Sequence, residues 1–148
     1  PIRVYGALNI NAKNFDRELE RTVKKVENGM WGFLTQPVLT AEAMENLNKA
    51  HERLAPLGAK LLGGIIPVVS SRNARFMNSE ISGITVDQRI IDIYEGKTRD
   101  ECTELAVDIS TDIAKRIAGF CDGYYLMTPF SRTDIMSRLV GNIKEMNK

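Results

Sequence analysis

The chain alternates between two patterns of apolar residues. Four short segments, at residues 3–10, 31–38, 60–69 and 121–128, are almost wholly apolar. Such runs are typical of strands that are buried on both faces of a parallel sheet. Between these segments, apolar residues recur every three or four positions, as they do on one face of an α-helix. The pattern therefore predicts strands and helices in alternation.

Capping residues mark where the helices begin and end. Asn14, Thr40 and the Thr98-Arg-Asp-Glu101 capping box precede apolar periodic segments, and Gly29 follows the first of them. We expect helices at about 15–28, 72–78, 86–95 and 98–120, with another between Thr40 and Pro56 and a last one that ends near residue 146. The longest helix carries an apolar stripe that we expect to face the sheet: Cys102, Leu105, Ile109, Ile113 and Ile117.

Four strand–helix units in succession favour an α/β fold of parallel strands joined by right-handed crossovers. A small open doubly wound sheet and half of an eight-stranded barrel both fit this order. The first strand leaves through Leu8-Asn-Ile-Asn-Ala12, without the glycine fingerprint of a dinucleotide fold. The glycine-rich segment 58–64 enters a strand and does not open a helix. We therefore favour half of a (β/α)8 barrel.

Composition adds little about partners. The chain has 148 residues, of which 43% are apolar and 26% charged, as expected for one soluble domain. Its net charge is +1 and its basic residues are dispersed, so we expect no nucleic-acid surface. No apolar run approaches the roughly 20 residues that span a bilayer, so we expect no membrane partner and a cytoplasmic location. Because the chain begins at Pro1 without Met, we expect it to be a piece of a longer protein.

The sequence offers no metal site. Cys102 and Cys121 are the only cysteines, and we expect two buried reduced thiols, as is usual in the cytosol. His51 is the only histidine and lies in a charged helical stretch. No His or Cys pair has the spacing of zinc ligands.

The second strand becomes polar where it ends. Thr35 and Gln36 follow the apolar run and precede Pro37. In parallel α/β proteins, ligands bind at this carboxyl end of the strands. The amide of Gln36 offers two donors and an acceptor, so it suits the edge of a heterocycle. The alternative is a polar residue that only leads into a loop.

Four motifs occur in an order that resembles a known family: Phe33-Leu-Thr-Gln-Pro37, Gly64-Ile-Ile-Pro-Val68, Ser70-Ser-Arg-Asn-Ala74 and Asp122-Gly-Tyr-Tyr-Leu-Met-Thr-Pro129. Together they look like the C-terminal half of a methylenetetrahydrofolate reductase. The chain is most similar to the reductase domain fused behind a homocysteine S-methyltransferase in bifunctional bacterial proteins.

The resemblance implies that residues 1–148 supply strands five to eight of a TIM-type (β/α)8 barrel that binds FAD. The implied reaction converts 5,10-methylenetetrahydrofolate to 5-methyltetrahydrofolate with NAD(P)H, in one-carbon and methionine metabolism. The general acid of the family lies in the absent half, so we expect no catalytic residue here and an inactive fragment.

The resemblance also implies roles for individual residues. Gln36 matches the glutamine that binds the folate pterin. Ser71 and Met127 match positions at the substrate where the single-function reductases tend to carry an aromatic residue and a tyrosine. Arg72 and Arg132 are weaker candidates for binding a substrate carboxylate.

For the cofactor, the resemblance implies that Glu18 lies near the FAD ribose and Lys25 near its pyrophosphate. Ala7 and Asn9 would lie along the flavin edge. A charged pair on a helix is otherwise a solvated face.

Two other functions remain open from the sequence. One is a non-redox pterin-binding barrel segment of a methyl-transfer protein. The other is a structural module whose free strand edges pair with a second copy, giving a homo-oligomer, or with the missing N-terminal half-barrel.

Overall fold

The computed structural model describes residues 1–148 and contains one four-stranded parallel sheet. Its strand order is β1-β2-β3-β4, the order of the sequence. The predicted α/β class and the parallel pairing are confirmed. The strands are β1 (Tyr5–Leu8), β2 (Gly32–Pro37), β3 (Lys60–Ile65) and β4 (Gly123–Leu126).

Each strand is shorter than its apolar segment. The clearest case is β3, which ends at Ile65 although the apolar run continues through Val69. Pro67 has no N–H group for the ladder, and Pro67 and Val68 are buried in the connection that follows the strand. The apolar run therefore indicates which residues are buried, and it extends past the last residue that is in the strand.

Six helices connect and follow the strands, in the places that the apolar periodicity predicted. They are α1 (Phe15–Glu27), α2 (Ala41–Leu54), α3 (Ser71–Glu80), α4 (Gln88–Tyr94), α5 (Arg99–Ile117) and α6 (Thr133–Met146), with short 3-10 turns at η1 (Ala55–Leu57), η2 (Ala118–Phe120) and η3 (Pro129–Ser131). The predicted caps are confirmed. Asn14 and Thr40 accept hydrogen bonds from backbone N–H groups in the first turns of α1 and α2, and Thr98 and Glu101 form the capping box of α5.

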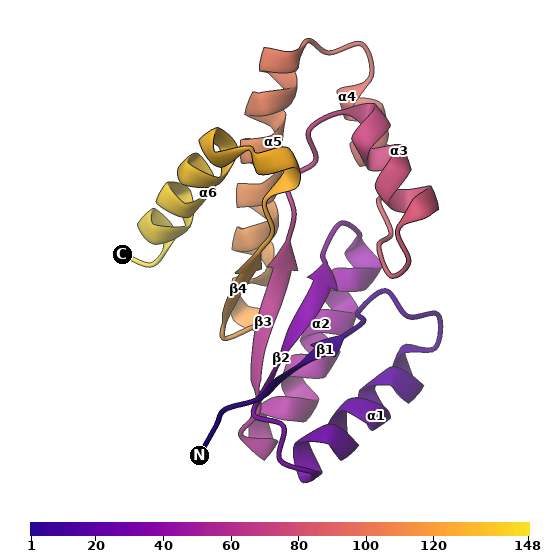
Figure 1. Cartoon of the computed structure of the whole chain (residues 1–148), viewed down its shortest axis with the longest axis vertical. Coiled ribbons are helices and arrows are strands. Elements are labelled where there is room, and N and C mark those ends of the chain that lie inside the picture. Colours follow the sequence, from indigo (N-terminus) through magenta and orange to yellow (C-terminus); the bar gives the residue numbers. More distant parts are fainter.

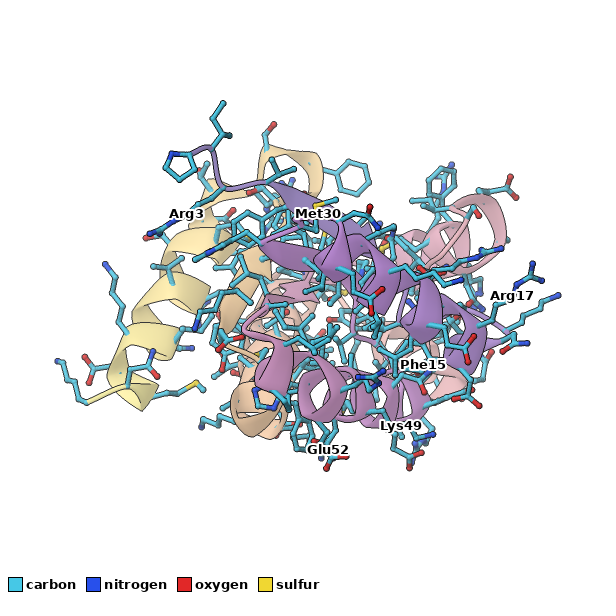
Figure 2. All side chains as sticks on the ribbon, turned by 90° about the horizontal axis from the view of Figure 1, so that it is seen from below. Arg3, Phe15, Arg17, Met30, Lys49 and Glu52 are labelled. Carbon is cyan, nitrogen blue, oxygen red and sulfur yellow. The ribbon has the colours of Figure 1, made fainter.

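The helices cover one face of the sheet. Figure 1 shows α2 and α5 behind the strands, and Figure 2 shows α2, with the labelled Lys49 and Glu52, opposite the amino-terminal segment that carries Arg3. Phe33, Leu61 and Ile65 point to the helices and are at most 1% exposed.

The opposite face of the sheet is apolar but has no helix over it. Ala7, Leu34, Leu62 and Gly123 form one row across the four strands. Ala7 is exposed and the others, including the two leucines, are only half-buried. Parallel sheets normally have both faces covered, so an uncovered apolar face is unusual for such a sheet.

The prediction that the apolar stripe of α5 faces the sheet was only partly right. Cys102, Ile113 and Ile117 are buried, but Leu105 and Ile109 are only half-buried. The reason is that α5 also packs against α6, where Ala106 and Val107 of α5 form a small cluster with Ile135 of α6. Small residues on the second face of a helix are easily overlooked beside larger apolar ones.

Both cysteines are free thiols, as predicted. Cys102 is buried, whereas Cys121 is half-buried and its Sγ donates to the carbonyl of Ile117 at 3.3 Å. Burial raises the pKa of both thiols. No three or more His, Cys, Asp or Glu side chains lie together as a metal site would require. None of the helices combines the length and the apolar character needed to cross a membrane.

The pairing of β2 with β3 is interrupted where β2 ends. The register shifts between Leu34 and Pro37, and at this point the N–H of Gly64 donates to Oγ1 of Thr35 at 2.8 Å. That hydroxyl in turn donates to the carbonyl of Gln36 at 2.9 Å. A Cβ atom on Gly64 would lie 2.5 Å from the carbonyl oxygen of Thr35, so the close approach requires glycine. This irregularity sets the direction in which Gln36 leaves the strand.

We expect Thr35→Val to destabilise the chain, because it leaves the buried N–H of Gly64 without an acceptor. The loss in the free energy of unfolding should be about 1–3 kcal/mol. Urea denaturation followed by circular dichroism measures it.

The matched control is Thr22→Val, since Thr22 is fully buried but its hydroxyl donates to the helical carbonyl of Glu18. That carbonyl also has a backbone donor within the helix, so the control should change stability by less than Thr35→Val. Equal losses for both variants would contradict the role of the Thr35 hydroxyl.

Candidate functional site

The side chain of Gln36 lies at the carboxyl end of β2, beside Asn9 and Gly83. A Cβ atom built on Gly83 would lie 3.4 Å from Cδ of Gln36 and 3.6 Å from Nδ2 of Asn9. Gly83 has a φ of +84°, which favours glycine independently of the crowding. Gln36 is half-buried, and its amide forms no hydrogen bond within the chain. Its donors and acceptor are therefore free for a ligand.

Asn11 ties together the three segments around Gln36. Its Nδ2 donates to the carbonyl of Gly83 at 2.8 Å and to the carbonyl of Pro37 at 3.3 Å. Its backbone N–H donates to Oδ1 of Asn9 at 3.0 Å. The connection between α3 and α4 is thereby held over the ends of β1 and β2 (Figure 1).

The sequence reasoning did not single out Asn11. The available signal was the pair of asparagines that leaves the first strand, because Asn side chains readily bond to nearby backbone. A second asparagine, Asn46 of α2, fixes the connection between β1 and α1, because its buried Nδ2 donates to the carbonyl of Ile10 at 2.9 Å.

The four predicted cofactor residues lie together at the free edge of β1. The ammonium of Lys25 donates to the carbonyl of Ala7 at 3.5 Å, and the N–H of Asn9 donates to Oε1 of Glu18 at 3.3 Å. Just before the two strands, the carbonyl of Val4 accepts from the N–H of Trp31 at 2.9 Å. Backbone groups alternate in direction along a strand, so those of Ala7 and Asn9 point to the free edge. Two charged side chains of α1 thus occupy backbone groups that no strand uses.

The other two predicted substrate residues lie farther along the sheet. Ser71 is the first residue of α3, after the N-cap Ser70, and is half-buried. Met127 follows β4 and is half-buried, with its N–H bonded to the carbonyl of Ile65 at 2.9 Å. Since β3 lies between β2 and β4, Met127 is two strands away from Gln36. The structure brings Gln36 to Asn9 but does not bring Met127 to Gln36.

Arg132, a weaker candidate from the sequence, is already engaged in the fold. Its guanidinium donates to Asp134 at 2.8 Å and to Oγ1 of Thr103 at 2.8 Å. The hydrogen bond from Arg132 lowers the pKa of Asp134 to about 2. Arg132 therefore serves to fix the start of α6 against α5. Arg72, by contrast, is exposed and forms no ion pair within the chain.

The fold defines the chain as a parallel α/β protein with helices on one face of a four-stranded sheet. No family model matches the chain, and no curated protein matches its sequence.

Solved structures do share the fold. The chain is similar to an uncharacterised protein from Clostridium thermocellum that binds two copies of 5-methyl-5,6,7,8-tetrahydrofolic acid, with 18% identity and a TM-score of 0.66 over 98% of this chain and 53% of that one. It is also similar to a noncanonic maltogenic alpha-amylase, AmyB, from Thermotoga neapolitana, with 11% identity and a TM-score of 0.53 over 99% of this chain and 44% of that one. The chain thus spans about half the length of these neighbours. At such identities the likeness shows the fold alone.

We expect Asn11→Ala to loosen the connection between α3 and α4, because two carbonyls lose their donor. Amide hydrogen exchange should become faster at residues 81–86 while the strands keep their protection. A suitable control is Asn48→Ala, since Asn48 is half-buried on α2 and its side chain forms no hydrogen bond in the chain. Unchanged exchange at residues 81–86 in Asn11→Ala would show that the connection is held by its packing alone.

Proposed function

We propose that the chain is the C-terminal half of a (β/α)8 barrel and binds a reduced folate through the amide of Gln36. The observation that carries this proposal is the free, half-buried amide beside Asn9 at the carboxyl end of the strands. In barrel enzymes, ligands bind at this end.

The topology supports the half-barrel. A doubly wound sheet reverses its strand order at a switch point and carries helices on both faces. Here the strands follow the order of the sequence and the helices lie on one face, as in the wall of a barrel. Both structural neighbours are about twice as long as this chain. The apolar face formed by Leu34 and Leu62 would then be the interior, covered by the missing half or by a second copy.

The chemistry of the site supports a folate. A pterin presents donors and acceptors along one edge, and a carboxamide can pair with both kinds without adding charge. One neighbour binds 5-methyltetrahydrofolate, and the motifs around Gln36 and Ser71 resemble methylenetetrahydrofolate reductase. These two independent likenesses point to the same class of ligand.

We extend the proposal to a flavin-dependent reductase that uses NAD(P)H in the cytosol, in one-carbon and methionine metabolism. The residues at the edge of β1 fit FAD: Lys25 is exposed with only a 3.5 Å contact, so its charge is available for a pyrophosphate, and Glu18 is suited to ribose hydroxyls. A bound flavin would supply the hydride transfer, and Gln36 would orient the folate. Glu18 is the one carboxylate at this edge that contacts the strand, and it is engaged with Asn9. The isolated chain should therefore bind ligand without turnover.

A non-redox folate-binding barrel of a methyl-transfer protein is the second candidate. It is favoured by the neighbour's ligand, which is already a methylated folate. The two candidates differ in whether the chain binds flavin.

We expect Gln36→Leu to weaken binding of 5-methyltetrahydrofolate about tenfold or more, which corresponds to loss of hydrogen bonds worth about 1.4 kcal/mol. Isothermal titration calorimetry measures the affinity. Gln88→Leu is the matched control, because Gln88 is exposed on α4 and bonds only to Asp92. If both variants bind like the unmodified chain, Gln36 is a loop residue and the proposed function fails.

We expect Lys25→Gln to weaken FAD binding, because it removes the one cation that contacts the edge of β1. The expected loss is about tenfold, as for a charged hydrogen bond. Flavin fluorescence quenching measures it, with Lys24→Gln as the control on the same helix. Folate binding by an unmodified chain that binds no FAD would favour the non-redox candidate.

A further inference from the structure

We propose that the side chain of Asn9 determines specificity beside Gln36, by selecting a ring that presents an oxo group over one that presents an amino group. Asn9 offers a donor with a fixed direction, and a donor pairs with an oxo oxygen but not with an amino group. The identity of the ring as a pterin rests on the proposed function. The resemblance implies only a flavin contact for Asn9, so this role goes beyond it.

The carboxamides of Asn9 and Gln36 lie at the same place in the fold. A Cβ atom built on Gly83 would be in contact with both, at 3.4 Å from Cδ of Gln36 and 3.6 Å from Nδ2 of Asn9. The two residues come from neighbouring strands, since Asn9 directly follows β1 and Gln36 lies at the end of β2 (Figure 1). One ring can therefore contact both amides.

The orientation of the Asn9 amide is set by Asn11. The N–H of Asn11 donates to Oδ1 of Asn9 at 3.0 Å, which is an Asx turn. A backbone N–H can only donate, so the atom that faces it is the oxygen, and the nitrogen of the amide faces the other way. Asn11 is itself held, because its Nδ2 donates to the carbonyls of Gly83 and Pro37. Asn9 thus presents its NH2 group in a fixed direction, on the side of Gln36.

Both amides are open to a ligand. Asn9 and Gln36 are half-buried, and neither Nδ2 of Asn9 nor the side-chain amide of Gln36 forms a hydrogen bond within the chain. The hydroxyl of Tyr94 is the one buried side-chain polar atom without a partner. The two amides are therefore in contact with solvent, and a ligand can replace that solvent without breaking a bond of the fold.

The two amides differ in what they accept. The Gln36 amide is free to turn, so it can pair with an oxo oxygen and with the ring N–H beside it. Asn9 can only donate through Nδ2. Of the two exocyclic groups of a pterin, it can pair with the oxo oxygen, whereas the amino group would bring two donors together and leave both unsatisfied. A site of this kind rejects an analogue whose oxo group is replaced by an amino group.

Tetrahydrofolate and tetrahydroaminopterin differ only in this group, which is oxo in the first and amino in the second. Calorimetry without oxygen, at a mildly alkaline pH where both rings are uncharged, compares their affinities. The unmodified chain should bind tetrahydrofolate about tenfold more tightly. In Asn9→Asp, one oxygen can still accept from Asn11 and the other becomes an acceptor for the ligand, so the preference should reverse. The matched control is Asn48→Asp on α2, which adds the same charge and should keep the preference.

Asn9→Ser is a second variant that adds no charge. Its hydroxyl can still accept from the N–H of Asn11, but the shorter side chain does not reach the ring, so the two ligands should bind about equally. Equal binding of both ligands by the unmodified chain would overturn the role of Asn9, as would an unchanged preference in both Asn9 variants. In either case, weaker binding in Gln36→Leu would still support the proposed function. If neither ligand binds to the unmodified chain, the proposed function itself fails, and the role of Asn9 fails with it.

Discussion

The contact between the Thr35 hydroxyl and the N–H of Gly64 is the interaction on which the candidate site depends. In a regular register Gln36 would pair with Gly64, but the register shifts after Leu34 and Pro37 takes that place. The hydroxyl takes the place of a backbone acceptor, and the missing side chain of Gly64 lets the two strands approach. Thr35 and Gly64 thus decide where the Gln36 amide points. The shift in register between β2 and β3 thus gives the Gln36 side chain a fixed direction at the end of its strand.

The one-sided sheet gives the chain its other main property. Buried side chains such as Phe33 and Leu61 join the strands to the helices, whereas the row of Ala7, Leu34 and Leu62 is left without a helix over it. The same sheet therefore has one face covered by helices and one apolar face left open, as the proposed half-barrel requires.

The sequence predicted the elements well because each has its own local signal. The caps at Asn14, Thr40 and Thr98 and the apolar periodicity located the helices. The end of an apolar run likewise placed Gln36 at the carboxyl end of a strand. Contacts between distant segments gave no such signal. Asn11 bonds to Gly83, 72 positions away, and the second apolar face of α5 became visible only when α6 packed on it. The register shift at Thr35 likewise depends on the neighbouring strand and could not be read from one segment.

The charged side chains at the outer edge of β1 have a consequence for assembly. Lys25 and Glu18 occupy the carbonyl of Ala7 and the N–H of Asn9, the two groups that an incoming strand would use. A chance neighbour must displace both side chains before it gains its first ladder bonds, and inward-pointing charges of this kind discourage fibre-like growth. The edge of β1 is therefore protected against unspecific strand pairing while both hydrogen bonds are formed.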